Sequence, residues 1–335
     1  MDRRIIGGKG PSAAAAAPAP PQVQHLRVDE SSAGQRLDNY LLRELKGVPK
    51  THVYRVIRSG EVRLNKGRAA ADTRVQAGDD VRVPPLRLPE RQAASAPPRE
   101  FAVLYEDDWL LAIDKPAGVA VHGGSGVSFG VVEQLRRARP QARFLELVHR
   151  LDRETSGVLL LAKKRSALTA LQDQFRARDT AKSYAALVRG DWPDKLRRID
   201  VPLHKYLLPD GERRVRTAAA GDAQAKPSIT LVRVAQRFAG CSLLDVSIKT
   251  GRTHQIRVHL AQAGHPIVGD DKYGDFEFNK SLARGDAVPG LRFEGMFLHA
   301  RRLGFEHPAS GQRIELEAPL PAAGAALLAR LPPAA

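Results

Sequence analysis

The chain has 335 residues, a length that favours two domains, and 43% of them are hydrophobic, which is enough for a sizeable buried core. Lys and Arg number 53 against 37 Asp and Glu, and the net charge of +16 predicts a polyanionic partner. The single cysteine, Cys241, excludes an internal disulfide framework and favours a reducing compartment, so we expect a cytoplasmic protein. The longest aliphatic run, 158–162, is far too short to cross a membrane.

Both ends of the chain are rich in Ala and Pro. Residues 1–33 are predicted to form a disordered tail, because prolines interrupt any apolar helical stretch there. Residues 321–335 have the same composition and are predicted to form a second tail. An apolar patch of Leu327, Leu328 and Leu331 in this second tail is able to dock on the core. We expect no chemistry from either segment.

Residues 34–87 predict a small ααβ module. Apolar residues recur there at helical spacing in two segments, and a period-two pattern typical of strands follows. These residues are Leu37, Tyr40, Leu41 and Leu45 in the first helix, Val53, Val56 and Ile57 in the second, and Val62, Leu64, Val81 and Val83 in the strands.

The same module carries twelve basic and six acidic residues. Basic side chains around its second helix favour phosphate binding, although a solvated helix face would have the same pattern. The sequence RLD at 36–38 and the turn RSGEVRLN at 58–65 resemble the S4 RNA-binding domain. We therefore expect RNA contacts from five side chains of this module, namely Lys50, Arg55, Arg58, Arg63 and Lys66.

A linker and a larger domain are predicted to follow. Residues 88–100 lack periodicity, and their Pro, Ala and charged residues are typical of a linker. Over 101–320, strand and helix patterns alternate irregularly, which predicts an α+β fold with a mixed or antiparallel sheet. The expected strands cover 109–113, 158–162, 184–188 and 243–248, and the expected helices cover 130–139, 166–178 and 253–263.

A charged turn runs directly into an apolar strand between residues 149 and 162. Its sequence, HRLDRETSG followed by VLLLA, places Asp152 at the margin of the core. A single Asp between two arginines is more often a structural ion pair than a catalytic group. The motifs elsewhere in the chain decide between these two interpretations.

This turn resembles the catalytic motif of the RluA-type pseudouridine synthases, in particular the RluC-like enzymes of large-subunit ribosomal RNA. Further motifs of that family follow in the same order over residues 101–305. They are DKPAG at 114–118 with His122, KSY at 182–184, KTGRTHQIRVH at 249–259, and PIVGD at 266–270 with YG at 273–274.

The resemblance implies an enzyme that converts uridine to pseudouridine in large-subunit ribosomal RNA. It assigns Asp152 as the catalytic carboxylate, Tyr184 as the aromatic side chain that packs on the target base, and Arg252 as the partner of Asp152. It also makes Arg150 a candidate to fill the gap left by a flipped nucleotide. A phosphate clamp is an equally good role for that guanidinium.

Two mechanisms remain open for such a carboxylate. It can attack C1′ as a nucleophile, or it can remove the C2′ proton to give a glycal. Both require an ionised carboxylate, and a neighbouring arginine offsets the desolvation that would protonate it. The sequence has no metal-ligand cluster, phosphate loop or dinucleotide fingerprint, so we expect no metal and no cofactor. We also expect a monomer.

Two other functions are less consistent with the pattern. Residues 126–130, GVSFG, match the nucleophile elbow of hydrolases, but they follow a glycine-rich loop instead of a buried strand. A noncatalytic RNA-binding factor would fit the basic charge. Such a factor would not need Asp152, Tyr184 and Arg252 together.

Overall fold

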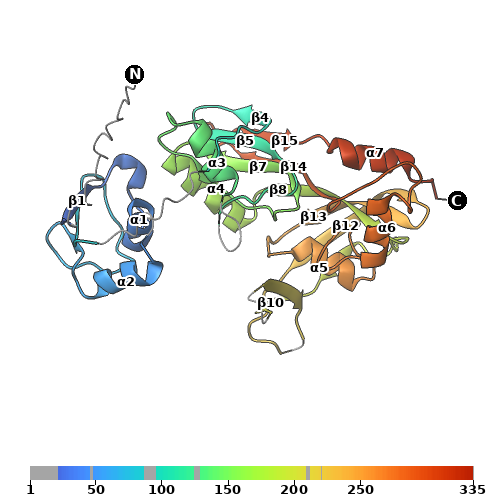
Figure 1. Ribbon diagram of the computed structural model, residues 1–335, viewed down its shortest axis with the longest axis horizontal. Helices are drawn as coiled ribbons and strands as arrows, with labels where there is room; N and C mark the ends of the chain where they lie inside the picture. Colours follow the sequence, from blue (N-terminus) through green and yellow to red (C-terminus); the bar gives the residue numbers. More distant parts are fainter. Residues whose placement is uncertain are drawn as a thin grey trace, which may run out of the picture. The chain divides into compact units, whose positions relative to one another are not determined.

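The computed structural model describes residues 22–45, 48–86, 96–123, 129–208, 212–219 and 221–334. The chain divides into two compact units, residues 1–94 and residues 95–335 (Figure 1). No helix within these described ranges is long and apolar enough to cross a membrane.

The first unit is built from two helices and a three-stranded antiparallel sheet with the order β1-β3-β2. The apolar stripes expected from the sequence pack together in one buried cluster, as helical and strand periodicity predict. The elements are β1 (Gln24–Arg27), the short 3-10 helix η1 (Glu30–Ser32), α1 (Leu37–Glu44), α2 (Lys50–Arg58), β2 (Arg63–Leu64) and β3 (Asp80–Val83).

The strand β1 corrects the prediction of a tail over 1–33. Leu26 of β1 lies opposite Val81 of β3, and Val28 is buried in the same cluster. The tail prediction is therefore wrong from Gln24 onward, because this short segment completes the sheet through backbone hydrogen bonds that its composition does not reveal. Residues 1–21 lie outside the described part of the chain, as do residues 87–95 of the predicted linker.

The second unit is organised around a ten-stranded mixed sheet, as the predicted α+β class requires. Its strand order is β4-β5-β7-β14-β8-β13-β12-β9, with β6 beside β7 and β15 beside β14; β7 and β14 pair in parallel. The strands are β4 (Val103–Glu106), β5 (Leu110–Lys115), β6 (Glu146–Leu147), β7 (Ser156–Ala162), β8 (Ala181–Arg189), β9 (Arg198–Asp200), β12 (Ile229–Phe238), β13 (Cys241–Ile248), β14 (Leu298–Glu306) and β15 (Arg313–Glu317). A separate two-stranded sheet pairs β10 (Leu203–Leu207) with β11 (Arg213–Thr217).

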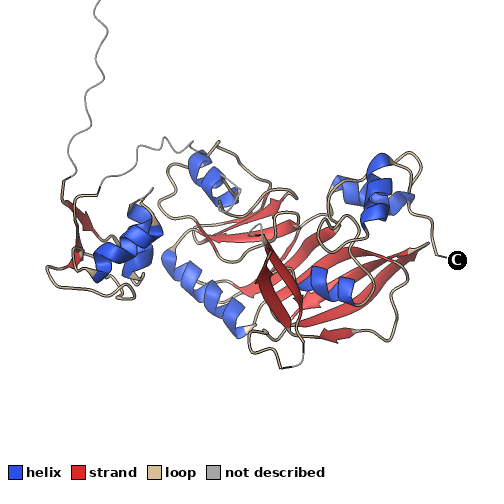
Figure 2. Ribbon diagram, turned by 60° about the horizontal axis from the view of Figure 1, so that its bottom comes forward, coloured by secondary structure: helices blue, strands red, loops and turns tan. Residues whose placement is uncertain are grey.

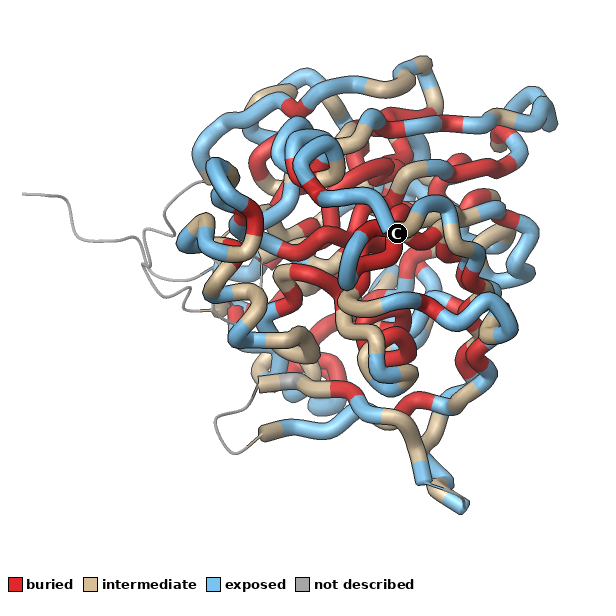
Figure 3. The backbone as a smooth tube through the Cα atoms, turned by 90° about the vertical axis from the view of Figure 1, so that its right-hand side faces the viewer, coloured by how far each residue is buried: buried red, intermediate tan, exposed pale blue. Residues whose placement is uncertain are grey.

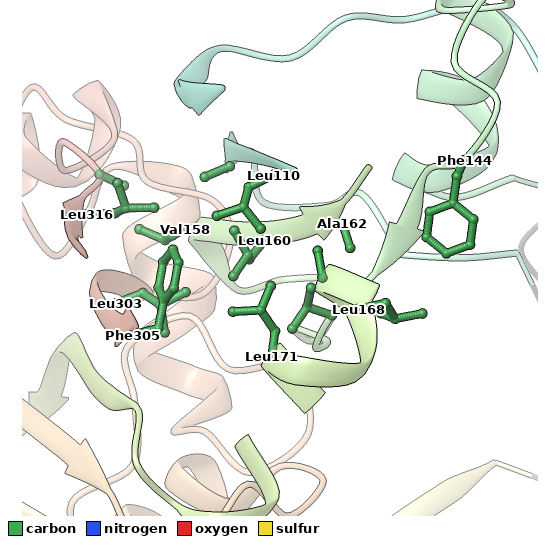
Figure 4. Close-up of a cluster of buried hydrophobic side chains, with 14 residues drawn as sticks. Leu110, Phe144, Val158, Leu160, Ala162, Leu168, Leu171, Leu303, Phe305 and Leu316 are labelled. Carbon is green, nitrogen blue, oxygen red and sulfur yellow. The ribbon is translucent and has the colours of Figure 1, made fainter. Parts of the chain in front are cut away.

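Strand β7 is buried on both faces, which explains its continuous aliphatic sequence. Leu160 faces a cluster that includes α4 (Figure 4). Leu159 belongs to a second cluster, which includes residues of α3. Gly157 has a φ of 109°, and a Cβ at this position would lie 2.2 Å from Ala300 O on β14. Only glycine therefore allows the two central strands to approach this closely.

Helices cover the sheet on both sides (Figure 2). Exposed loops surround the buried segments of the second unit (Figure 3). Three helices match the sequence prediction, and α6 was not predicted. The helices are α3 (Val131–Ala138), α4 (Arg165–Ala177), α5 (Gln255–Gln262), α6 (Phe276–Arg284) and α7 (Ala322–Arg330).

Helix α7 corrects the prediction of a tail over 321–335. Alanine and leucine are strong helix formers, and Pro321 precedes the first turn, where it breaks no hydrogen bond. Leu327 is fully buried and Leu331 nearly so, in a cluster that also contains Leu282 of α6. The expected docking of the apolar patch is confirmed, and it makes this segment part of the second unit.

Candidate active site

The turn that carries Asp152 lies between β6 and β7, and the buried side chain of Lys115 holds it in place. Lys115 is fully buried at the end of β5, and its Nζ donates hydrogen bonds to the carbonyl oxygens of Pro116, Val119 and Arg153 at 2.8 to 3.1 Å. Burial lowers the pKa of Lys115 to about 8. Thr155 N donates to Asp152 O at 3.1 Å and closes the turn.

Asp152 lies where two cavities meet. Its side chain is 19% exposed, so the carboxylate is partly desolvated but remains accessible. One cavity of about 100 Å³ lies between this turn, β8 and the start of α5, and a wider one of about 470 Å³ opens beside it. Four charged or polar side chains line both cavities, namely Arg150, Asp152, His254 and Arg257.

Arg257 is the arginine that faces Asp152. Its Nη1 lies 3.8 Å from Asp152 Oδ2, and its side chain is only 3% exposed. The predicted partner, Arg252, does not face Asp152 in the structure. Arg252 is exposed in the loop before α5, and its Nε donates to Pro227 O at 3.3 Å. The two arginines lie in the same motif, but only Arg257 is on the inward face of the helix.

Two acidic residues hold Arg257 in place. Its Nε and Nη2 donate to the two carboxylate oxygens of Asp270 at 2.7 and 2.6 Å, and Nη2 also donates to Asp271 at 3.0 Å. Burial opposes the charge of Arg257, but the hydrogen bond and charge of Asp270 outweigh it and raise the pKa of the guanidinium. Burial likewise opposes the charge of Asp270, yet its bonds to Arg257 lower its pKa. This bidentate pair presents a permanent cation to Asp152.

Tyr184 lies on β8 and lines the smaller cavity with Asp152. Burial, followed by the negative charge of Asp152, raises the pKa of its hydroxyl above the ordinary value of 10. The side chain is therefore a neutral phenol at physiological pH. It offers an aromatic face and a polar edge to a molecule in the cavity.

His254 is a site residue to which the sequence analysis assigned no role. Its Nε2 lies 3.9 Å from Asp152 Oδ2, and its Nδ1 lies 2.9 Å from the hydroxyl of Tyr273. The signal for it was its place beside the two arginines in GRTHQIRVH. Among the described residues, no group of three potential ligands could hold a metal ion.

The remaining predicted residues have accessible positions. Arg150 is exposed at the rim of both cavities. In the first unit the basic side chains lie on α2, on β2 and on the turn after β2, and none of the five is buried: Lys50, Arg55, Arg58, Arg63 and Lys66. Ser128 of the GVSFG segment lies outside the described residues.

Known proteins are similar to this chain in both sequence and fold. A family model described as RNA pseudouridylate synthase matches residues 109–262, and one described as S4 domain matches residues 35–81. The chain therefore belongs to the pseudouridine synthase family, as an RNA pseudouridine synthase with an S4 domain. Relatives called ribosomal large subunit pseudouridine synthase C from Escherichia coli K12 and Yersinia pestis are each 50% identical over 307 residues, covering 90% of this chain and 94% and 93% of theirs.

Two solved human structures agree with this assignment. RNA pseudouridylate synthase domain containing 4 superposes with a TM-score of 0.56 at 28% identity, over 69% of this chain and 92% of the other. RNA pseudouridylate synthase domain containing 1 gives a TM-score of 0.51 at 26% identity, over 70% and 97% of the two chains. The expected family is confirmed.

Proposed function

We propose that this enzyme isomerises uridine to pseudouridine in large-subunit ribosomal RNA and that Asp152 is its catalytic carboxylate. The observation that carries this assignment is the position of Asp152, accessible from two cavities and 3.8 Å from the buried cation of Arg257. The names of the relatives that are 50% identical support the choice of substrate. These relatives match 90% of the chain.

The reaction needs an anion at the position of Asp152. The bond between C1′ and N1 must break, the uracil must turn, and C1′ must bond to C5. A carboxylate serves either as nucleophile at C1′ or as base at C2′, and both roles require the ionised form. Arg257 supplies the positive charge that keeps the carboxylate ionised when RNA excludes water from the cavity.

Three further side chains of the cavities have roles in this proposal. Tyr184 stacks on the target uracil while the base is detached, because its neutral ring lines the same cavity as Asp152. Arg150 occupies the gap in the RNA after the nucleotide is extruded, or clamps a neighbouring phosphate. Arg252 is exposed and lines the smaller cavity, so it contacts RNA without directly pairing with the carboxylate.

The first unit anchors the substrate in this proposal. Its basic side chains on α2, on β2 and in the turn that follows β2 contact phosphates and do not take part in the reaction. The enzyme acts in the cytoplasm. It is a monomer, and light scattering of the purified protein would test this oligomeric state.

Substitution of Asp152 by asparagine tests the proposal. We expect Asp152→Asn to abolish tritium release from RNA labelled at C5 of uridine, while RNA affinity stays within about threefold, because the amide keeps the shape but cannot attack C1′ or accept the proton. The matched control is Glu154→Gln, an acidic residue of the wider cavity whose carboxylate accepts a hydrogen bond from Arg153 and does not bind Arg257. Turnover by Asp152→Asn within about tenfold of wild type would refute the catalytic assignment.

A further inference from the structure

The hydroxyl of Tyr273 connects the hairpin of β10 and β11 with the loop before α5. It accepts a hydrogen bond from Val215 N of β11 at 3.0 Å, and it lies 2.9 Å from His254 Nδ1. The pKa of the Tyr273 hydroxyl is raised, mainly by burial, so the hydroxyl keeps its proton at neutral pH. A backbone N–H can only donate. The proton of the Tyr273 hydroxyl is therefore available to His254.

This arrangement leaves one nitrogen of His254 for its own proton. The pKa of His254 is lowered, mainly by burial. The ring is therefore neutral at physiological pH, and only one of its two nitrogens carries a proton. If Nδ1 accepts the proton of Tyr273, the ring proton must lie on Nε2. Nε2 is the nitrogen that lies 3.9 Å from Asp152 Oδ2.

The same carboxylate oxygen has a second donor nearby, since Arg257 Nη1 lies 3.8 Å from Asp152 Oδ2. Both distances are longer than a hydrogen bond, as is common in a catalytic site without substrate. With the proton on Nε2, His254 would present a donor to Asp152. With the proton on Nδ1, it would present a lone pair to the same negative charge.

We propose that His254 is a positioning residue for Asp152, and that Tyr273 fixes the imidazole tautomer in which the Nε2 proton faces the carboxylate. His254 and Arg257 then both orient the carboxylate through its Oδ2 oxygen. Because Tyr273 is also bonded to β11, this tautomer depends on the hairpin being docked on α5, where Val215, Val258 and Tyr273 pack together. The inference rests on the proposed function of Asp152.

A purely structural role for His254 makes a different prediction. The residue has φ 51° and ψ 21°, a left-handed conformation in which asparagine is well tolerated and glutamine is not. A backbone role therefore predicts that His254→Asn is the better replacement. A positioning role predicts the reverse, because the amide nitrogen of glutamine reaches the place of Nε2, whereas that of asparagine reaches only the place of Nδ1.

The tautomer can be measured directly by NMR on the full-length protein labelled with ¹⁵N-histidine. The His254 resonances are identified by their loss in His254→Gln. We expect an unprotonated Nδ1 and a protonated Nε2 in the wild type, and a mixture of both tautomers in Tyr273→Phe. A protonated Nδ1 in the wild type, or an unchanged pattern in Tyr273→Phe, would overturn the proposal.

Kinetics with the two replacements provide the second test. We expect kcat of His254→Gln within about fivefold of wild type and kcat of His254→Asn reduced roughly 30-fold with KM little changed, a loss typical of a lost orienting contact. Melting temperatures measured alongside separate folding from catalysis. Asparagine equal to or better than glutamine in kcat would overturn the positioning role. If the wild type forms no pseudouridine in large-subunit RNA, the proposed function fails, whereas the NMR result still decides the tautomer.

Discussion

Replacement of Arg257 by methionine probes the ion pair that the structure places behind Asp152. Methionine keeps the apolar stem of the side chain but leaves the fully buried Asp270 without the two hydrogen bonds of 2.6 and 2.7 Å. Removing one partner of a buried pair costs about 3 to 5 kcal/mol of unfolding free energy. Asp270 still accepts hydrogen bonds from the backbone N–H of Lys272 and Tyr273. We therefore expect the lower end, about 3 kcal/mol.

The loss should depend on pH in a defined direction. In the wild type the pKa of Asp270 is lowered, so this group stabilises the fold above pH 4 and loses that effect as pH falls through its folded pKa. Without Arg257, burial is the largest remaining influence, so the pKa of Asp270 moves upward from its wild-type value. As pH falls, Asp270 becomes protonated in the variant, and the cost of burying its unpaired charge is removed. The difference in unfolding free energy between Arg257→Met and wild type should therefore be smaller at pH 5 than at pH 7.

Urea unfolding at these two pH values measures the effect. Arg252→Met is the matched control, and because that side chain is exposed we expect it to change the unfolding free energy by less than about 0.5 kcal/mol. Adding Asp270→Asn to Arg257→Met should recover stability but no turnover, since the cation beside Asp152 is still missing. A cost for Arg257→Met below about 1 kcal/mol at pH 7 would refute the reasoning.

Three other predictions concern the rest of the molecule. Since burial lowers the pKa of Lys115 to about 8 from 10.5, stability should rise between pH 8 and 10 by up to about 3 kcal/mol, and denaturant unfolding of Lys115→Met should lack this rise. Deleting residues 1–94 should weaken RNA binding and flatten its dependence on salt, measured by filter binding; an unchanged slope would contradict the anchoring role. Tritium release from a short RNA whose fold survives chelation should be unaffected by EDTA, and rescue by one stoichiometric divalent ion would contradict this.

Periodicity predicted most of the elements, because burial of one face imposes the same spacing on any helix or strand. It did not find β1, whose four residues pair with β3 mainly through backbone atoms. It also did not predict the helix α7, because an alanine-rich composition is compatible with both a tail and a helix. Short or compositionally ambiguous segments are decided by their tertiary partners.

The site shows the same limit at the level of single residues. The motifs pointed to Asp152 and Tyr184, and the structure brings both to one cavity. The choice between Arg252 and Arg257 could not be made from spacing, because it depends on Asp270, a residue on the loop after α5. The contact of His254 with Tyr273 likewise follows from the packing of that loop.

The position of β14 has a consequence for synthesis of the chain. This strand lies between β7 and β8 in the sheet, yet its residues, 298–306, are among the last to be made. Until β14 has left the ribosome, β7 and β8 each have an unpaired edge and lack the strand that lies between them in the finished sheet. Asp152 precedes β7 and Tyr184 lies on β8, so the two side chains meet only when the chain is almost complete. A nascent chain that already displays its first unit would thus be able to bind RNA before it is able to modify it.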